Sequence, residues 1–218
     1  MTSEIRPPAV RPRTAGQPEA DLTTFAIIHR AMRGEARRLA ALTAEQGDLP
    51  FPAEREAALQ RHLDHLLHEI HSHHAREDAI VWPVLVASAG AAIDLGPLTE
   101  DHAAIDPCLD RIRATRGVAR ATALADLRDL LDEHITEEEA SVFPVLRRYV
   151  SKDDWDRCEK EIAKGPFGQM KWVVPLIAAY STPPELAHLL KEAGPVMRLI
   201  LRLTRPSFTR LSRAVYGA

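Results

Sequence analysis

A short motif that pairs histidine with glutamate occurs twice in this chain. The segment HHAREDAIVWP at 73–83 recurs as HITEEEASVFP at 134–144, and valine and leucine follow both copies. Residues four apart lie one above the other on the same face of a helix. Each copy can therefore present one imidazole and one carboxylate in the same direction. The two pairs are His73 with Glu77 and His134 with Glu138.

Two further histidines extend this pattern, because they lie on the apolar stripes of two other predicted helices. Imidazole nitrogens and carboxylate oxygens together suit iron, manganese or zinc. Two carboxylates can each bridge two metal ions that lie about 4 Å apart, and four histidines then supply two nitrogens to each ion. A lone histidine on such a face is usually a hydrogen-bonded core residue, but a repeated set favours metal binding. The predicted ligands are His29, His73, Glu77, His102, His134 and Glu138.

Three more residues are candidates for extra ligands or for hydrogen-bond partners of the ligands. His74 lies about 100° around the helix from the preceding motif histidine, which favours a position at the boundary of the site. Asp106 follows His102 by one turn, but the adjacent proline disturbs that turn, so both roles stay open for it. Glu69 lies one turn before the first motif and is a candidate hydrogen-bond partner. The other histidines of this helix are predicted to be mostly solvated: His62, His65, His68 and His71.

Amphipathic helices are the elements that must position these residues. Apolar residues recur at helical spacing in four stretches: 21–46, 53–88, 97–116 and 119–149. No stretch alternates as a strand would. Short loops between four such helices predict an all-α, up-down-up-down four-helix bundle over 21–149. Residues 150–218 are predicted to add C-terminal helices, with Pro206 splitting the last of them. The proline-rich residues 1–20 are predicted to form a disordered tail.

Composition excludes several classes of protein. The chain has 218 residues, 45% of them hydrophobic, and a net charge of −3, which gives no reason to expect nucleic acid as a partner. Its two cysteines are too few for a disulfide framework or a cysteine-based zinc site. No signal peptide and no membrane-spanning segment are predicted. We therefore expect a cytoplasmic protein.

The motifs resemble those of the hemerythrin-like, HHE cation-binding family of di-iron four-helix proteins. The resemblance covers about 21–149 and rests on these segments: His29-Arg30, His73-x-x-x-Glu77 with Trp82-Pro83, Glu100-Asp101-His102, and His134-x-x-x-Glu138 with Phe143-Pro144. It implies two iron ions per chain with an oxo or hydroxo bridge, and zinc or manganese are weaker candidates. Oxygen-carrying members place a second histidine where this chain has Asp106, and they use a longer His–Asp spacing on the fourth helix. Similar members are associated with iron or redox sensing, peroxide breakdown and nitric oxide handling.

The expected function is that of a non-haem di-iron protein whose partner is a small molecule: dioxygen, hydrogen peroxide or nitric oxide. The near-symmetric ligand set favours peroxide breakdown, a catalase-like activity, over reversible oxygen carriage. The alternative is an iron-, oxygen- or redox-sensing module without turnover, and a zinc or iron-storage bundle is a third hypothesis. The tail at 195–218 is basic and amphipathic. It is expected to dock on the bundle, or to contact a membrane surface or another protein.

Overall fold

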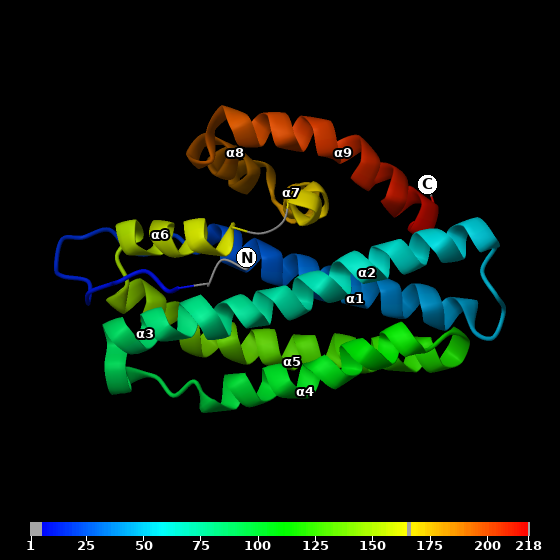
Figure 1. The fold of residues 1–218 in the computed structure, drawn as a ribbon, viewed down its shortest axis with the longest axis horizontal. Coiled ribbons are helices and arrows are strands. Elements are labelled where there is room, and N and C mark those ends of the chain that lie inside the picture. The colour runs from blue at the N-terminus through cyan, green and yellow to red at the C-terminus, as the bar shows by residue number, and fades with distance from the viewer. Residues whose placement is uncertain (1–5, 165–166, 218) are drawn as a thin grey trace. The chain divides into compact units, whose positions relative to one another are not determined.

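Helices make up most of the computed structural model, which describes residues 6–164 and 167–217 (Figure 1). The β-structure found in these ranges is an isolated bridge between Glu19 and Ser151. The predicted all-α fold is therefore confirmed. The elements are α1 Thr23–Gln46, α2 Ala53–Arg76, the π-helix η1 Glu77–Val81, α3 Trp82–Ala89, the 3-10 turn η2 Gly90–Ala92, α4 Gly96–Ala114, α5 Gly117–Tyr149, α6 Lys152–Ile162, α7 Phe167–Tyr180, α8 Pro183–Glu192 and α9 Gly194–Tyr216.

The long helix predicted over 53–88 is interrupted by a turn of π-helix. Pro83 has no backbone N–H, and its ring would clash with the carbonyl of Ala79 in a regular α-helix. The helix widens just before this proline, and the N–H of Trp82 donates to the carbonyl of Glu77, five residues back. Proline alone does not force this change, because α5 passes through Pro144 as a continuous α-helix. The two copies of the motif therefore differ in backbone geometry.

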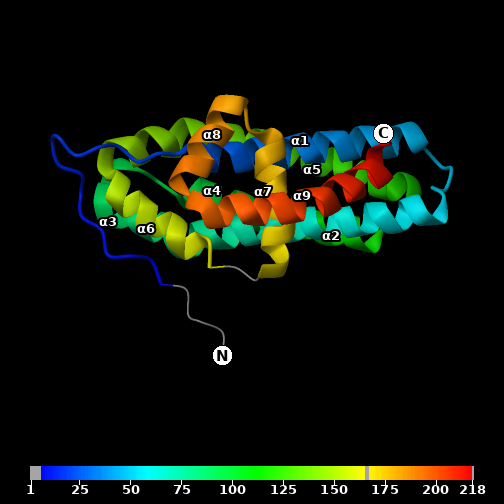
Figure 2. The ribbon, with the colours of Figure 1, turned by 90° about the horizontal axis from the view of Figure 1, so that it is seen from above.

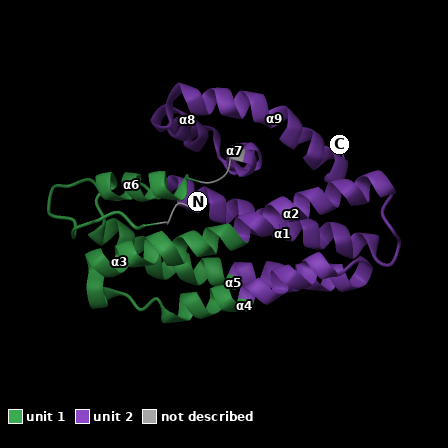
Figure 3. Ribbon diagram, viewed as in Figure 1, with its two compact units in different colours: residues 1–22, 71–104, 133–165 green, residues 23–70, 105–132, 166–218 purple. Residues whose placement is uncertain are grey.

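The chain divides into two compact units, which are coloured in Figure 3. Unit 1 contains the segments that carry both histidine–glutamate motifs, together with α3 and α6. Unit 2 contains α1, most of α2, the adjoining parts of α4 and α5, and α7 to α9. The residues of unit 1 are 1–22, 71–104 and 133–165, and those of unit 2 are 23–70, 105–132 and 166–218.

Unit 2 is held together by apolar side chains from the helices of the predicted bundle. Its largest fully buried side chains include Ile27, Met32, Leu39, Leu59 and Leu66. The C-terminal helices add to this core, because α7 packs on α1 and α9 packs on α7. The helix α9 is continuous through Pro206, which the sequence predicted to split it. None of the described helices is both long enough and apolar enough to cross a membrane.

A buried carboxylate in unit 2 joins two bundle helices to the C-terminal helices. Glu35 of α1 lies 2.6 Å from Nε2 of His62 on α2, and the hydroxyl of Tyr216 on α9 donates to the same carboxylate at 2.6 Å. The hydroxyl of Tyr180 on α7 donates to it at 2.7 Å, and Arg38 donates at 2.9 Å. The prediction that the histidines of this helix are mostly solvated is therefore wrong for His62, which is buried.

Gly34 of α1 allows α7 to approach closely. A Cβ atom at this position would overlap the ring of Tyr180. We therefore expect Gly34→Ala to lower the free energy of unfolding by about 1–3 kcal/mol, the usual cost of overpacking, even though alanine is the better helix former. Urea unfolding followed by circular dichroism measures this. Gly168→Ala on α7 is the control, since no atom outside the local backbone lies near its Cβ position.

The N-terminal segment of unit 1 is fixed along α5 and α6. The N–H of Arg13 donates to the carbonyl of Tyr149 at 2.8 Å, and the N–H of Lys152 donates to the carbonyl of Pro18 at 3.0 Å. The sequence predicted a disordered tail over 1–20. Residues 6–20 instead form coil with a turn at 15–17, held by these long-range hydrogen bonds, and residues 1–5 lie outside the described residues. Prolines prevent a helix here, but they do not prevent docking.

Candidate metal centre

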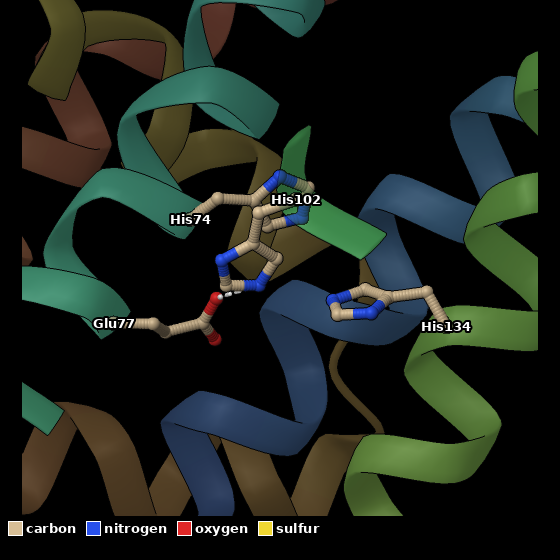
Figure 4. A group of neighbouring side chains, drawn as sticks. All are labelled: His74, Glu77, His102 and His134. Carbon is tan, nitrogen blue, oxygen red and sulfur yellow. Dashed lines mark ion pairs between the residues drawn. The ribbon is translucent and has the colours of Figure 1, made fainter. Parts of the chain in front are cut away.

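Four buried residues of unit 1 bring their ligand atoms together. His74 at the end of α2, Glu77 in η1, His102 on α4 and His134 on α5 each offer one atom, and these atoms all lie within 4.8 Å of one another (Figure 4). Three chain segments distant in sequence therefore contribute to one cluster. The arrangement has the size and the donor types of a metal site, with three imidazoles and a carboxylate.

Glu77 is the centre of this cluster. Its Oε1 atom lies 2.8 Å from Nε2 of His73, and its Oε2 atom lies 3.5 Å from Nε2 of His102. In the second copy of the motif, Nε2 of His134 lies 3.7 Å from Oε2 of Glu138. Both carboxylates are almost completely buried. Burial of two carboxylates in one small region is costly without compensating positive charge, which a cation would supply.

The imidazoles of the cluster pack against one another. The rings of His74 and His102 are stacked with centroids 4.3 Å apart, and the rings of His102 and His134 are 4.9 Å apart. Burial lowers the pKa of His74 well below its usual value. Burial, and then the nearby His102, lowers the pKa of His134 to about 4. At neutral pH the rings of His74 and His134 are therefore uncharged, which is the form that binds a metal ion.

His74 provides the test of whether a metal ion fits this cluster. Among the described residues, neither of its ring nitrogens has a hydrogen-bond partner, although both are buried. An unsatisfied buried polar atom costs about 1–3 kcal/mol. A metal ion bound by this imidazole would remove that cost for one nitrogen. The side chains present therefore fit a metal ion.

Two aspartates orient the histidines of the cluster. Nδ1 of His102 lies 3.1 Å from Asp78, and Nδ1 of His134 lies 3.3 Å from Asp101. A proton on each Nδ1 atom leaves the lone pair of Nε2 free for a metal ion, and the carboxylate makes the imidazole more basic. Neither aspartate was predicted to orient a histidine, although Asp101 lies in one of the segments that carry the family resemblance. Their positions in the sequence could have indicated this role, because Asp78 directly follows Glu77 and Asp101 directly precedes His102.

Comparison with known families agrees with this chemistry. The family model of the Hemerythrin HHE cation binding domain matches residues 21–146, more than half of the chain. The chain belongs to this family. No curated protein and no solved structure matches it. The resemblance inferred from the two motifs is therefore confirmed, and the buried cluster lies on segments inside the matched range.

The other predicted site residues of this hemerythrin HHE domain differ from one another in burial and in their contacts. His74 lies inside the cluster and not at its boundary, because it precedes Glu77 by three residues and so shares a helix face with it. Asp106 is exposed on α4, which argues against its role as a ligand. Glu69 is buried on α2 and accepts a hydrogen bond from Gln169 of α7 at 2.9 Å. His29 is buried on α1 in unit 2, and its role as a ligand stays a prediction.

We predict that Asp101→Ala weakens metal binding about 10- to 100-fold, because His134 loses the acceptor that orients its ring. Competition with a chromogenic chelator measures the affinity. Asp106→Ala is the matched control, since it removes an exposed carboxylate from the same helix. Equal metal affinity in both variants would show that Asp101 does not position His134.

Proposed function

We propose that this hemerythrin HHE domain holds two iron ions and uses them to bind or transform a small oxygen or nitrogen species. The observation that carries the proposal is the buried cluster of three imidazoles around the Glu77 carboxylate. His74, His102 and His134 would hold one ion together with Glu77. His29 and His73 are the proposed ligands of the second ion, and Glu77 and Glu138 are proposed to be shared by both ions.

Iron bound here would supply Lewis acidity and electron transfer to the small molecule. The chain itself contributes three things. It keeps His74 and His134 neutral by burying them. It orients His102 through Asp78 and His134 through Asp101. It also limits access of water, because Trp82 stacks on His102 with centroids 5.9 Å apart and α6 packs against η1. A dry site strengthens the electrostatic interactions inside it.

The position of His74 bears on which reaction is favoured. The nearly symmetric ligand set predicted from the sequence favours peroxide breakdown. With His74 in the cluster, one side of Glu77 has three imidazoles, so the two ions would have unequal ligands. Unequal coordination suits a small molecule that binds at one ion, which oxygen sensing without turnover requires. Peroxide breakdown, which needs no other reactant, stays our first proposal for the reaction. The unequal ligands make oxygen sensing the second candidate function.

Metal analysis of the purified full-length protein grown with iron tests the centre. We expect two iron ions per chain and a near-ultraviolet absorption band, which zinc would not give. One firmly bound ion in every preparation would contradict the two-ion centre.

An oxygen electrode separates the two candidate functions. Breakdown converts two molecules of hydrogen peroxide into two of water and one of dioxygen, so it needs no other reactant. Oxygen release above that of free iron after addition of peroxide would support breakdown. No release, together with a reversible spectral change of the reduced protein in air, would favour sensing.

A further inference from the structure

The outer face of α9 carries an exposed apolar stripe. Val196, Leu199 and Leu203 are 68%, 56% and 69% exposed, and their spacing of three and four residues places them on one side of the helix. They are half of the large exposed hydrophobic residues among those described. The opposite side of the same helix is already used, because Leu201, Thr204 and Val215 are buried. The stripe is therefore additional to the surface that docks α9 within unit 2.

Five exposed arginines accompany this stripe. They are Arg198, Arg202, Arg205, Arg210 and Arg213. No acidic residue occurs from Ala193 to the end of the chain, although the whole chain has a net charge of −3. Several arginines elsewhere in unit 2 have carboxylate partners, such as Arg30 with Glu185 and Arg37 with Asp132. Positive charge is thus concentrated on one helix.

These arginines border a hollow beside α9. The hollow has a volume of about 630 Å³, and Leu190 of α8 closes one side of it. Thr209 adds a hydroxyl group to the lining. Guanidinium groups bind phosphate oxygens through paired N–H donors, so a cavity lined by several of them suits phosphate groups. Figure 2 shows α9 from above, lying across α7.

We propose that α9 binds the surface of an anionic phospholipid membrane. In this arrangement the arginines contact lipid phosphates, and Val196, Leu199 and Leu203 enter the boundary between headgroups and acyl chains. The charge of the helix complements that of anionic lipid, and the stripe supplies apolar area that a purely electrostatic partner would leave unused. The described helices contain no membrane-spanning segment, so the contact is peripheral.

The apolar stripe also decides against nucleic acid as the partner. Binding to a phosphate backbone depends on cationic side chains and salt, and it gains nothing from three aliphatic side chains in a row. A membrane interface uses both groups at once. Nucleic acid, a free phosphate ion and a second copy of the chain are therefore outcomes that the experiment must separate.

Vesicle co-sedimentation with the full-length, iron-loaded protein tests the proposal. One set of vesicles contains phosphatidylcholine alone, and the other also contains phosphatidylglycerol. We expect binding to the anionic vesicles and little to the neutral ones. Binding should weaken in about 1 M sodium chloride, where the Debye length falls to about 3 Å. No binding of the unaltered protein to anionic vesicles would overturn the proposal.

Variants separate the contributions of charge and apolar surface. Removing three charges by Arg202→Gln, Arg205→Gln and Arg213→Gln should weaken binding about 100-fold, because each arginine contributes about 1 kcal/mol near an anionic surface. Leu199→Ser with Leu203→Ser should weaken it about 10-fold or more. The control removes three exposed arginines elsewhere and should bind normally: Arg11→Gln, Arg61→Gln and Arg113→Gln.

The remaining outcomes identify other partners. Unchanged vesicle binding in the double leucine variant, with tight binding of duplex DNA, would identify nucleic acid and not the membrane as the partner of α9. Loss of vesicle binding in millimolar inorganic phosphate, at constant ionic strength, would show that the hollow binds free phosphate. Self-association that the leucine substitutions abolish, without vesicle binding, would assign the stripe to a second copy. Iron content should be the same in all variants, so failure here leaves the proposed di-iron centre untouched.

Discussion

Replacing Glu77 with alanine is expected to release metal from this hemerythrin HHE domain and to lower its melting temperature. Glu77 lies close to histidines from three segments of the chain, and it is one of the two carboxylates proposed to be shared by both ions. Loss of a direct ligand should weaken metal binding by more than the 10- to 100-fold typical of a hydrogen-bond partner. Because metal binding stabilises the folded state only, the melting temperature should fall as metal is lost.

Metal content by elemental analysis and melting by calorimetry are measured on the same preparations. His65→Ala is the matched control, because His65 stacks on Trp172 with centroids 5.6 Å apart and is not in the cluster. Full metal content and an unchanged absorption spectrum in the Glu77→Ala protein would contradict the assigned centre. A lower melting temperature with unchanged metal would show that Glu77 contributes only to packing.

The sequence predicted the structure correctly where residues of one kind recur at a regular spacing. Apolar residues at helical spacing predicted the four long helices, and the four-residue spacing predicted that each glutamate shares a face with its histidine. The same periodicity could not show the π-turn at Glu77–Val81. That turn depends on how the helix accommodates Pro83, and the equivalent Pro144 is accommodated without one. The effect of a proline on a helix is set by the packing around it.

The sequence predicted those parts of the site that lie close together along the chain, and it did not predict the contacts made by tertiary packing. His74 was placed at the boundary because it was compared with its neighbour His73, whereas its spacing from Glu77 puts it in the cluster. The aspartates that orient the rings act across 24 and 33 residues of sequence. The partners of Glu35 lie up to 181 residues away. Such pairings follow from tertiary packing, which helical periodicity along one sequence does not show.

The Glu35 carboxylate is expected to be the main electrostatic link between the bundle and the C-terminal helices. We predict that Glu35→Gln lowers the free energy of unfolding by about 3 kcal/mol at neutral pH, since it breaks a buried, hydrogen-bonded ion pair. An amide keeps the volume of the side chain but presents an N–H group to donors such as Tyr180 and Tyr216. Urea unfolding of both proteins measures the difference, and Glu54→Gln, at an exposed position on α2, is the control.

The same variant has a defined pH dependence. Burial alone would raise the pKa of Glu35, but the hydrogen bond and charge of His62, with the hydroxyls of Tyr216 and Tyr180, lower it from 4.5 to about 2. A lowered pKa in the folded state means that the carboxylate stabilises the protein above pH 4.5. This stabilisation is lost as the pH falls from 4.5 towards 2, since protonation then favours the unfolded chain.

The difference in unfolding free energy between the two proteins should therefore shrink from about 3 kcal/mol at neutral pH to about 1 kcal/mol at pH 3. Acid release of metal affects both proteins, so it largely cancels in this difference. Limited proteolysis gives a second measurement, because Tyr216 ties the end of α9 to Glu35 and a weaker link should expose α9 to cleavage. A difference that stays constant with pH would show that Glu35 acts through shape alone and not through its charge.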